Sequence, residues 1–166
     1  MDMSNFYRIT AIGFGAGLLP IAPGTWGAAV AALMMLPLMW AAPPITQLVL
    51  IAAIVVFSFW CAKAVDIFAE EWGEDPSRVV ADEMVGMWLT LVGLPLTLGN
   101  IGLGFLLFRF FDIAKPLGIR RLEKIPGGWG VVLDDVLAGV YANVVLQIIN
   151  LYFGDALFSK TLFSAL

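Results

Sequence analysis

The sequence predicts an all-α fold, a polytopic membrane helix bundle with about four to five transmembrane helices and an interfacial amphipathic helix. The first observation is composition: the 166 residues are 61% hydrophobic and 13% charged. The second is a mean hydropathy of +0.93. Soluble domains are nearer half apolar and a quarter charged, so a water-soluble fold would have nowhere to bury this apolar surplus. The length suits one integral membrane domain over residues 1–166.

Apolar runs, the third observation, give the expected spans. They cover residues 25–41, 45–62, 81–96, 100–114 and 133–153. A full span needs ~20 residues, so we expect the third and fourth runs to tilt or to use flanking segments. Residues 41–44, AAPP, predict a tight turn between the first two runs, because paired prolines cannot continue a helix. Residues 96–100, LTLGN, predict a second short turn.

The two longer connections carry most of the charge. In residues 63–78, apolar positions recur at helical spacing among acidic residues, which predicts the interfacial amphipathic helix. Residues 115–130 hold a cluster of lysines and arginines. By the positive-inside rule, these charges predict that the N-terminus and both long loops lie in the cytoplasm and the C-terminus outside. The tail after Asn150 either finishes the last span or lies along the outer interface.

Polar residues at four span ends share the cytoplasmic side in this topology. In chain order they are Thr25, Asp82, Glu83, Arg109, Asp112, Lys115, Asp134 and Asp135. Arg109, Asp112 and Lys115 follow at intervals of three and so share a helix face. Asp82 and Asp135 each precede a glycine by one helical turn, and a small residue there lets another helix approach closely. Each acid can then face a neighbouring helix rather than lipid.

The acid pairs 82–83 and 134–135 predict a metal site. Adjacent carboxylates repel one another where water is scarce, and a hard divalent cation such as Mg²⁺ removes that repulsion. Arg109 and Lys115 suit a phosphate, the arginine as a two-pronged donor and the lysine as a point charge. Acids, a metal and two cations at headgroup level describe a site for a phosphorylated lipid.

Single residues of this set also have structural interpretations. Asp82 alone is explained equally well as a helix cap or a partner of the helix dipole. Arg109 can be an interface anchor, and Thr25 a helix cap, although the helix start at Thr25 can also bind phosphate. The charges between Lys115 and Lys124 are explained as topology determinants. Convergence on one side of the membrane favours a site over separate structural roles.

Missing residues narrow the chemistry. The chain has no histidine, which excludes histidine-dependent phosphatases. Its one cysteine, Cys61, excludes an internal disulfide framework, and no arginine follows it closely enough for a cysteine phosphatase. No basic arm or stripe points to nucleic acid. Metal-assisted hydrolysis remains, in which carboxylates hold the metal and one of them can serve as general base.

Four segments resemble the phosphatidylglycerophosphatase A family. They are GFGAGLLPIAPGTWGA, DPSRVVADEMVG, FRFFDIAKP and GGWGVVLDDVLAG, in the family's order and between about Gly13 and Gly139. The resemblance implies a multi-pass, Mg²⁺-dependent lipid phosphatase of the bacterial inner membrane, with its active site facing the cytoplasm. It would convert phosphatidylglycerophosphate to phosphatidylglycerol and inorganic phosphate in phospholipid biosynthesis.

The eight polar residues fall on the family's motifs, and we assign their roles as expectations. The expected metal ligands are Asp82, Glu83, Asp134 and Asp135, which with Asp112 form the catalytic set. Asp112 orients Arg109 or joins the metal shell. Arg109, Lys115 and Thr25 are expected to bind the substrate. The pattern is compatible with one metal ion or two, and with any of these carboxylates as direct ligands.

Two other functions stay open at this point. Intramembrane acids also serve ion-coupled membrane transporters, although transporters usually place the site near the membrane midplane, at broken helices. A non-catalytic membrane assembly partner is the third hypothesis. The sequence leaves the oligomeric state and the preferred acyl chains undetermined.

Overall fold

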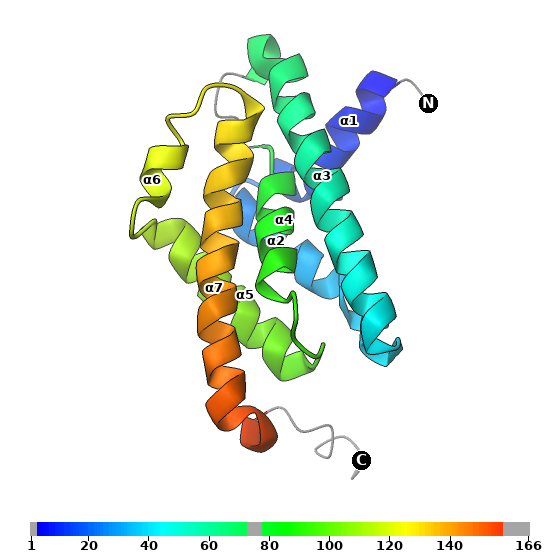
Figure 1. Ribbon diagram of the computed structural model, residues 1–166. Helices are drawn as coiled ribbons and strands as arrows, with labels where there is room; N and C mark the ends of the chain where they lie inside the picture. The colour runs from blue at the N-terminus through cyan, green and yellow to red at the C-terminus, as the bar shows by residue number, and fades with distance from the viewer. Residues whose placement is uncertain (1–2, 73–77, 158–166) are drawn as a thin grey trace.

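The computed structural model describes residues 3–72 and 78–157, and these residues form an all-α bundle, as predicted (Figure 1). In chain order the elements are α1 (Met3–Ala11), the 3-10 helix η1 (Gly13–Leu18), α2 (Pro23–Met34), the 3-10 helix η2 (Leu36–Trp40), α3 (Pro43–Trp72), α4 (Ala81–Thr90), α5 (Leu98–Ala114), α6 (Ile119–Leu122) and α7 (Gly128–Leu157).

Three segments of the described chain are long and apolar enough to cross a membrane: Pro23–Trp40, Pro43–Glu71 and Gly128–Phe153. They correspond to the first, second and fifth predicted spans, and they make the chain a membrane protein. The first segment changes from α2 to η2 at Met35, just before Pro37, because proline has no N–H to continue α-helical bonding. The predicted turn at residues 41–44 is confirmed, with α3 beginning at Pro43.

The third predicted span, the short run over residues 81–96, is not one continuous helix in the structure. Helix α4 has 10 residues, which gives a length of about 15 Å at 1.5 Å per residue. It ends at Thr90, and the Asn143 side chain donates to the carbonyl oxygens of Thr90 and Val92 at 2.9 and 2.8 Å. Helices α2, α3, α5 and α7 surround α4 (Figure 1). The segment is therefore apolar because protein encloses it, not because lipid does.

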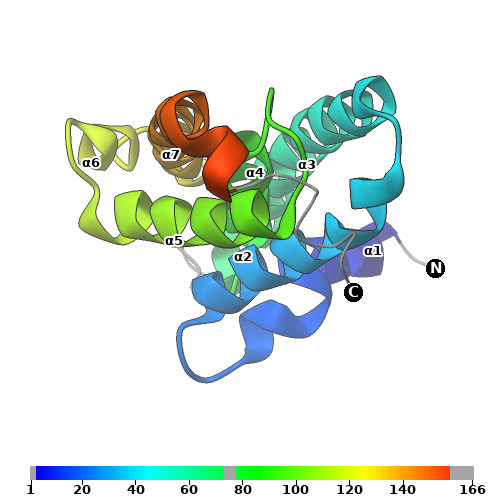
Figure 2. The same ribbon diagram turned by 90° about the horizontal axis from the view of Figure 1, so that it is seen from below.

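Helix α5 matches the fourth predicted run and has 17 residues, at the lower limit for a span. It lies across the bundle, whereas α7 is seen nearly end-on in the same view (Figure 2). The predicted turn before it is confirmed. Thr97 caps the helix, since its hydroxyl oxygen accepts the Asn100 N–H at 3.1 Å.

The prediction of a separate interfacial helix over residues 63–78 is wrong. Residues up to Trp72 continue α3 without a break, while residues 73–77 lie outside the described part of the chain. The apolar positions Val65 and Phe68 are buried, in one cluster with Tyr7 and Ala11 of α1. The amphipathic pattern therefore reflects packing of α3 against α1 rather than a helix lying on the membrane surface.

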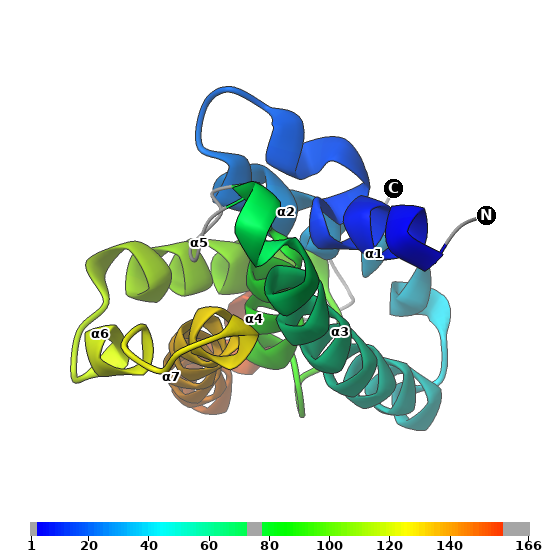
Figure 3. The ribbon, with the colours of Figure 1, turned by 90° about the horizontal axis from the view of Figure 1, so that it is seen from above.

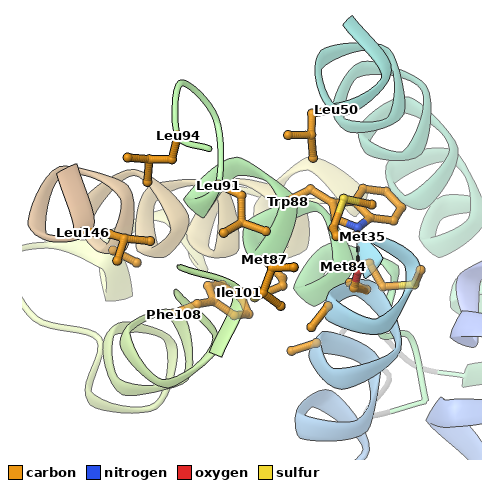
Figure 4. Packing of buried hydrophobic residues seen from close by; sticks show 14 of the residues in the cluster. Met35, Leu50, Met84, Met87, Trp88, Leu91, Leu94, Ile101, Phe108 and Leu146 are labelled. Carbon is orange, nitrogen blue, oxygen red and sulfur yellow. Dashed lines mark hydrogen bonds between the residues drawn. The ribbon is translucent and has the colours of Figure 1, made fainter. Parts of the chain in front are cut away.

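The core is centred on α4 (Figure 4). Trp88 is buried there, and its indole N–H donates to the Ala31 carbonyl oxygen at 3.1 Å, which ties α4 to α2. Phe108 of α5 and Leu146 of α7 close the cluster from the other side. Because large apolar side chains from four helices meet around α4, its position is set firmly relative to the rest of the bundle.

Helices α4 and α7 run in the same direction and touch through glycines (Figure 1). A Cβ added at Gly139 would lie 2.5 Å from the Gly86 carbonyl oxygen, and one at Gly86 would lie 2.7 Å from the Asp135 carbonyl oxygen. No side chain fits at either position. The contact confirms the prediction that small residues let neighbouring helices approach, and it brings the preceding turns of both helices together.

Candidate active site

A carboxylate triad forms where α4 and α7 begin. Asp82 and Glu83 lie in the first turn of α4, and Asp135 lies one turn before the glycine contact on α7. One oxygen from each carboxylate lies within 4.8 Å of the others. Asp82 is 7% exposed and Asp135 is 4% exposed. The spacing of each acid to its glycine thus places both at the same level of two adjacent parallel helices.

Carboxylate oxygens in the triad and in the adjacent Asp134 are left without hydrogen bonds. Asp82 Oδ1, Glu83 Oε2 and Asp134 Oδ1 are buried and accept no hydrogen bond from any described residue. A buried ionised carboxylate without a partner costs several kcal/mol, and crowding three acids adds repulsion. A hard divalent cation bound by carboxylate oxygens removes both costs. The donor set therefore fits such an ion, and three of the four predicted ligands come together in it.

Asp134, the fourth predicted ligand, belongs to an ion-pair network beside the triad. Lys115 Nζ donates to Asp134 Oδ2 at 2.6 Å and to Glu123 Oε1 at 2.5 Å. Burial alone would lower the pKa of Lys115, but the hydrogen bonds to Asp134 and Glu123 outweigh it, so the pKa is raised and the lysine stays charged. Lys115 ends α5 in a left-handed conformation, with φ of 45°, just before Pro116.

Arg109 and Asp112 form an ion pair one turn apart on α5, with side chains 15% and 12% exposed. The pair confirms that the two residues share a face, and the enclosed guanidinium does not fit an anchor at the membrane interface. Arg109 Nε is buried without a hydrogen-bond partner among the described residues. A side chain at Gly24 would overlap the Glu83 carboxylate and lie 3.3 Å from Arg109 Nη1, so glycine there lets α2 reach both.

The triad, Asp112, Asp134 and Lys115 line one cavity of about 540 Å³. Its lining comes from the start of α2, the first turn of α4, the first two turns of α7, the end of α5 and the loop after α6. Figure 3 shows this loop beside the start of α7. The residues are Pro23, Gly24, Val79, Asp82, Glu83, Asp112, Lys115, Glu123, Lys124, Ile125, Pro126, Gly127, Gly130, Val131, Asp134 and Asp135.

Besides Arg109, Thr25 is the predicted site residue that the structure does not bring into the lining. It lies inside the first turn of α2, where its backbone N–H donates to the Ala22 carbonyl oxygen at 2.9 Å. Ala22 is the N-cap, so the interpretation of Thr25 as the helix cap is wrong. Gly24, its neighbour, is the residue that contacts Glu83 and lines the cavity.

Sequence reasoning missed three residues that shape this region. Glu123 and Lys124 were interpreted only as topology charges, yet both line the cavity. Asp66 of α3 accepts the Gly128 N–H at 2.7 Å and so caps the start of α7. The Gly127-Gly128 pair was a usable sequence signal for the last contact, because paired glycines allow another segment to approach closely. In the structure, a Cβ at Gly127 would lie only 3.0 Å from Asp66 Oδ1.

Comparisons with known proteins show which family this chain resembles. The family model described as phosphatidylglycerophosphatase A matches residues 9–150. A protein of Bacteroides thetaiotaomicron named putative phosphatidylinositol-3-phosphatase is 46% identical over 140 residues, covering 82% of this chain and 88% of that protein. Phosphatidylglycerophosphatase A of Escherichia coli (strain K12) is 37% identical over 154 residues, covering 90% of this chain and 87% of the relative.

A third relative extends the same result. Phosphatidylglycerophosphatase A of Haemophilus influenzae is 36% identical over 151 residues, covering 88% of this chain and 90% of that protein. No solved structure matches the chain. Since the family model spans most of the sequence and relatives align over nearly the full length of both partners, the chain belongs to the phosphatidylglycerophosphatase A family.

Proposed function

We propose that the protein is a Mg²⁺-dependent lipid phosphatase that hydrolyses phosphatidylglycerophosphate to phosphatidylglycerol and inorganic phosphate in phospholipid biosynthesis. The observation that carries the proposal is the buried triad with unpartnered oxygens, set in a cavity beside two cationic side chains. Family membership supports the lipid phosphatase class, and two relatives bear the name of this activity.

The residues divide the work as follows in this proposal. Asp82, Glu83 and Asp135 hold Mg²⁺, which when bound offsets their charge and polarises a phosphoryl oxygen. Lys115, which lines the cavity, binds phosphate oxygens, and Arg109, which Asp112 orients beside the cavity, is the second phosphate-binding cation. Binding the phosphate against fixed donors places it for attack and stabilises the charge that develops on it.

Asp134 is the proposed general base. Its Oδ1 has no partner among the described residues and the side chain lines the cavity, while Lys115 holds Oδ2. Asp134 takes a proton from water as the water oxygen attacks phosphorus. The bond from phosphorus to the glycerol oxygen breaks, and that oxygen leaves as a hydroxyl when it receives the proton that Asp134 took from the water. Water and the phosphomonoester thereby become an alcohol and inorganic phosphate.

A second substrate has one specific observation in its favour. The Bacteroides relative at 46% identity is named for a phosphatidylinositol 3-phosphatase activity. That lipid also carries its phosphomonoester on a polyol headgroup, so the same groups would act on it. The transporter hypothesis fits less well, because the acids lie where two helices begin rather than at a break in the middle of a span.

The proposed location is the bacterial inner membrane, with the site facing the cytoplasm. The starts of α4 and α7 lie in the upper half of Figure 1, as does α6. Lys115, Arg120, Arg121 and Lys124 accompany them, and the positive-inside rule assigns such residues to the cytoplasmic side.

The decisive experiment measures phosphate release by purified protein from phosphatidylglycerophosphate, phosphatidylinositol 3-phosphate and phosphatidic acid, each with Mg²⁺ or with chelator. We expect Mg²⁺-dependent release that is fastest from phosphatidylglycerophosphate. Asp82→Asn and Asp135→Asn should each lower kcat by at least about 100-fold, the scale of a lost catalytic interaction of about 2.7 kcal/mol.

Glu70→Gln is the matched control, because Glu70 is an exposed acid of α3 outside the cavity. It should keep full activity. Phosphate release that persists in chelator, or full turnover by both aspartate variants, would remove the metal mechanism. Gradient-driven solute uptake into liposomes without phosphate release would favour the transporter instead.

A further inference from the structure

We infer that Lys124 binds the phosphodiester of the lipid headgroup, so that the cavity selects lipids carrying both a phosphodiester and a terminal phosphomonoester. The inference rests on the proposed lipid phosphatase function and specifies how its substrate is recognised. Three observations support it: the charge balance of the cavity, the position of Lys124 and the chemistry of the headgroup.

The charge balance of the cavity singles out Lys124. The lining contains six carboxylates and two lysines, Lys115 and Lys124. Lys115 is engaged by Asp134 and Glu123. Lys124 forms no ion pair with any residue in the described ranges, so it is the lining cation left free for an incoming anion. An anion entering this acid-rich cavity gains most where such a cation is available.

The position of Lys124 separates it from the reacting centre. Its neighbour Glu123 binds Lys115, and adjacent Cα atoms lie about 3.8 Å apart, so Lys124 is close to the Lys115 network. The side chain is exposed, whereas the triad aspartates are buried. The cavity therefore offers an inner position for an anion beside the triad and an outer position at Lys124.

The backbone holds the outer position in place. The Lys124 N–H donates to the Arg121 carbonyl oxygen at 3.4 Å, and the Ile125 N–H donates to the Leu122 carbonyl oxygen at 2.9 Å. Just beyond, Asp66 of α3 fixes the start of α7 by accepting the Gly128 N–H. Lys124 thus extends from a turn that is hydrogen-bonded to α6 on one side and is followed, at Gly128, by a hydrogen bond to α3.

The two positions match the headgroup chemistry. In phosphatidylglycerophosphate and in phosphatidylinositol 3-phosphate, a short polyol joins the phosphomonoester to the phosphodiester that carries the diacylglycerol. With the monoester in the inner position, the diester anion faces Lys124. Phosphatidic acid has the monoester directly on diacylglycerol and no diester, so it cannot use the outer position.

The test compares wild type, Lys124→Gln, Lys124→Arg and Arg121→Gln in mixed micelles with Mg²⁺. Arg121 is an exposed cation of α6 that lies outside the cavity lining, and it controls for general surface charge. Lys124→Gln should raise KM for phosphatidylglycerophosphate about two- to fivefold, the scale of an exposed charge pair, without changing kcat. Lys124→Arg should restore KM, and Arg121→Gln should leave it unchanged.

A second measurement uses soluble probes as competitive inhibitors. Glycerophosphoglycerol, which has the diester and no acyl chains, should inhibit Lys124→Gln more weakly than wild type. Inorganic phosphate, which occupies the inner position, should inhibit both equally. The inference is overturned if Lys124→Gln weakens inhibition by both probes equally, or if Arg121→Gln raises KM as much as Lys124→Gln does. In either case Lys124 would act only through the general electrostatic field.

The inference and the function that it extends fail in different ways. Wild type that releases no phosphate from any lipid overturns the lipid phosphatase proposal, and the role of Lys124 falls with it. Normal turnover with unchanged KM and unchanged inhibition in Lys124→Gln overturns the inference alone.

Discussion

Gly139 of α7 lies directly against the backbone of Gly86 in α4, so that a Cβ at position 139 would fall 2.5 Å from the Gly86 carbonyl oxygen. The contact sets the separation of the two helices one turn below the triad. The distance between the Asp82 and Asp135 carboxylates therefore depends on two residues that carry no side chain.

Gly139→Ala should force α4 and α7 apart. Because the added methyl group meets backbone, which cannot move aside cheaply, we expect a loss of about 1–3 kcal/mol in the free energy of unfolding. Metal-dependent activity should fall with it. The control is Gly102→Ala in α5, where nothing lies within 4 Å of the added Cβ. Equal thermal stability of the two variants in detergent would contradict the close contact.

Metal binding should be visible without turnover. Mg²⁺ bound to the triad stabilises the folded protein by mass action, so Mg²⁺ should raise the Tm of wild type and chelator should lower it. In Asp135→Asn the increment should vanish, while the metal-free variant should be at least as stable as metal-free wild type, since one buried repulsion is gone. A thermal shift series over Mg²⁺ concentration measures both effects, and an unchanged increment in Asp135→Asn would exclude Asp135 as a ligand.

Asp66 should stabilise α7 as a cap supplied from another helix. Asp66→Ala removes the acceptor of the Gly128 N–H, and we expect a loss of about 1 kcal/mol, as for other helix caps. Asp66→Asn keeps an acceptor and should recover most of that loss. Glu70→Ala, an exposed change one turn later on α3, should stay within about 0.5 kcal/mol of wild type. Chemical unfolding of the four proteins tests the ranking.

The proposed orientation predicts a labelling pattern. The native Cys61 is buried, so single cysteines introduced at Arg120 and at Ala42 are the reactive sites. Arg120 lies beside the site, and Ala42 lies in the turn between two candidate spans. In spheroplasts, a membrane-impermeant maleimide should label Ala42→Cys directly and Arg120→Cys only after lysis. The reverse pattern would place the site outside.

Much of the site could be predicted because its signals are local. The four-residue spacing from each acid to its glycine predicts a close helix contact, and the structure shows that contact. The three-residue interval between Arg109 and Asp112 similarly predicts their ion pair. Such relationships follow from helix geometry alone, so one sequence suffices to find them.

The errors came from contacts between distant segments. Hydropathy does not distinguish a helix enclosed by protein from one that faces lipid, so α4 was predicted to extend to residue 96. The charges after residue 62 suggested a new element, yet Val65 and Phe68 pack against α1 and keep α3 continuous. The position of Lys124 in the cavity lining depends on the path of the loop between α6 and α7. No local sequence pattern predicts that path.

The enclosure of α4 also constrains how the protein is made. A segment of 10 residues with two acids at its entrance is too short to partition into the bilayer by itself. Its cover includes α7, which is translated last of the described helices. Residues 81–90 must therefore stay near the membrane surface until α5 and α7 have inserted. A chain that ends before residue 128 lacks α7, so its central helix has no complete packing site.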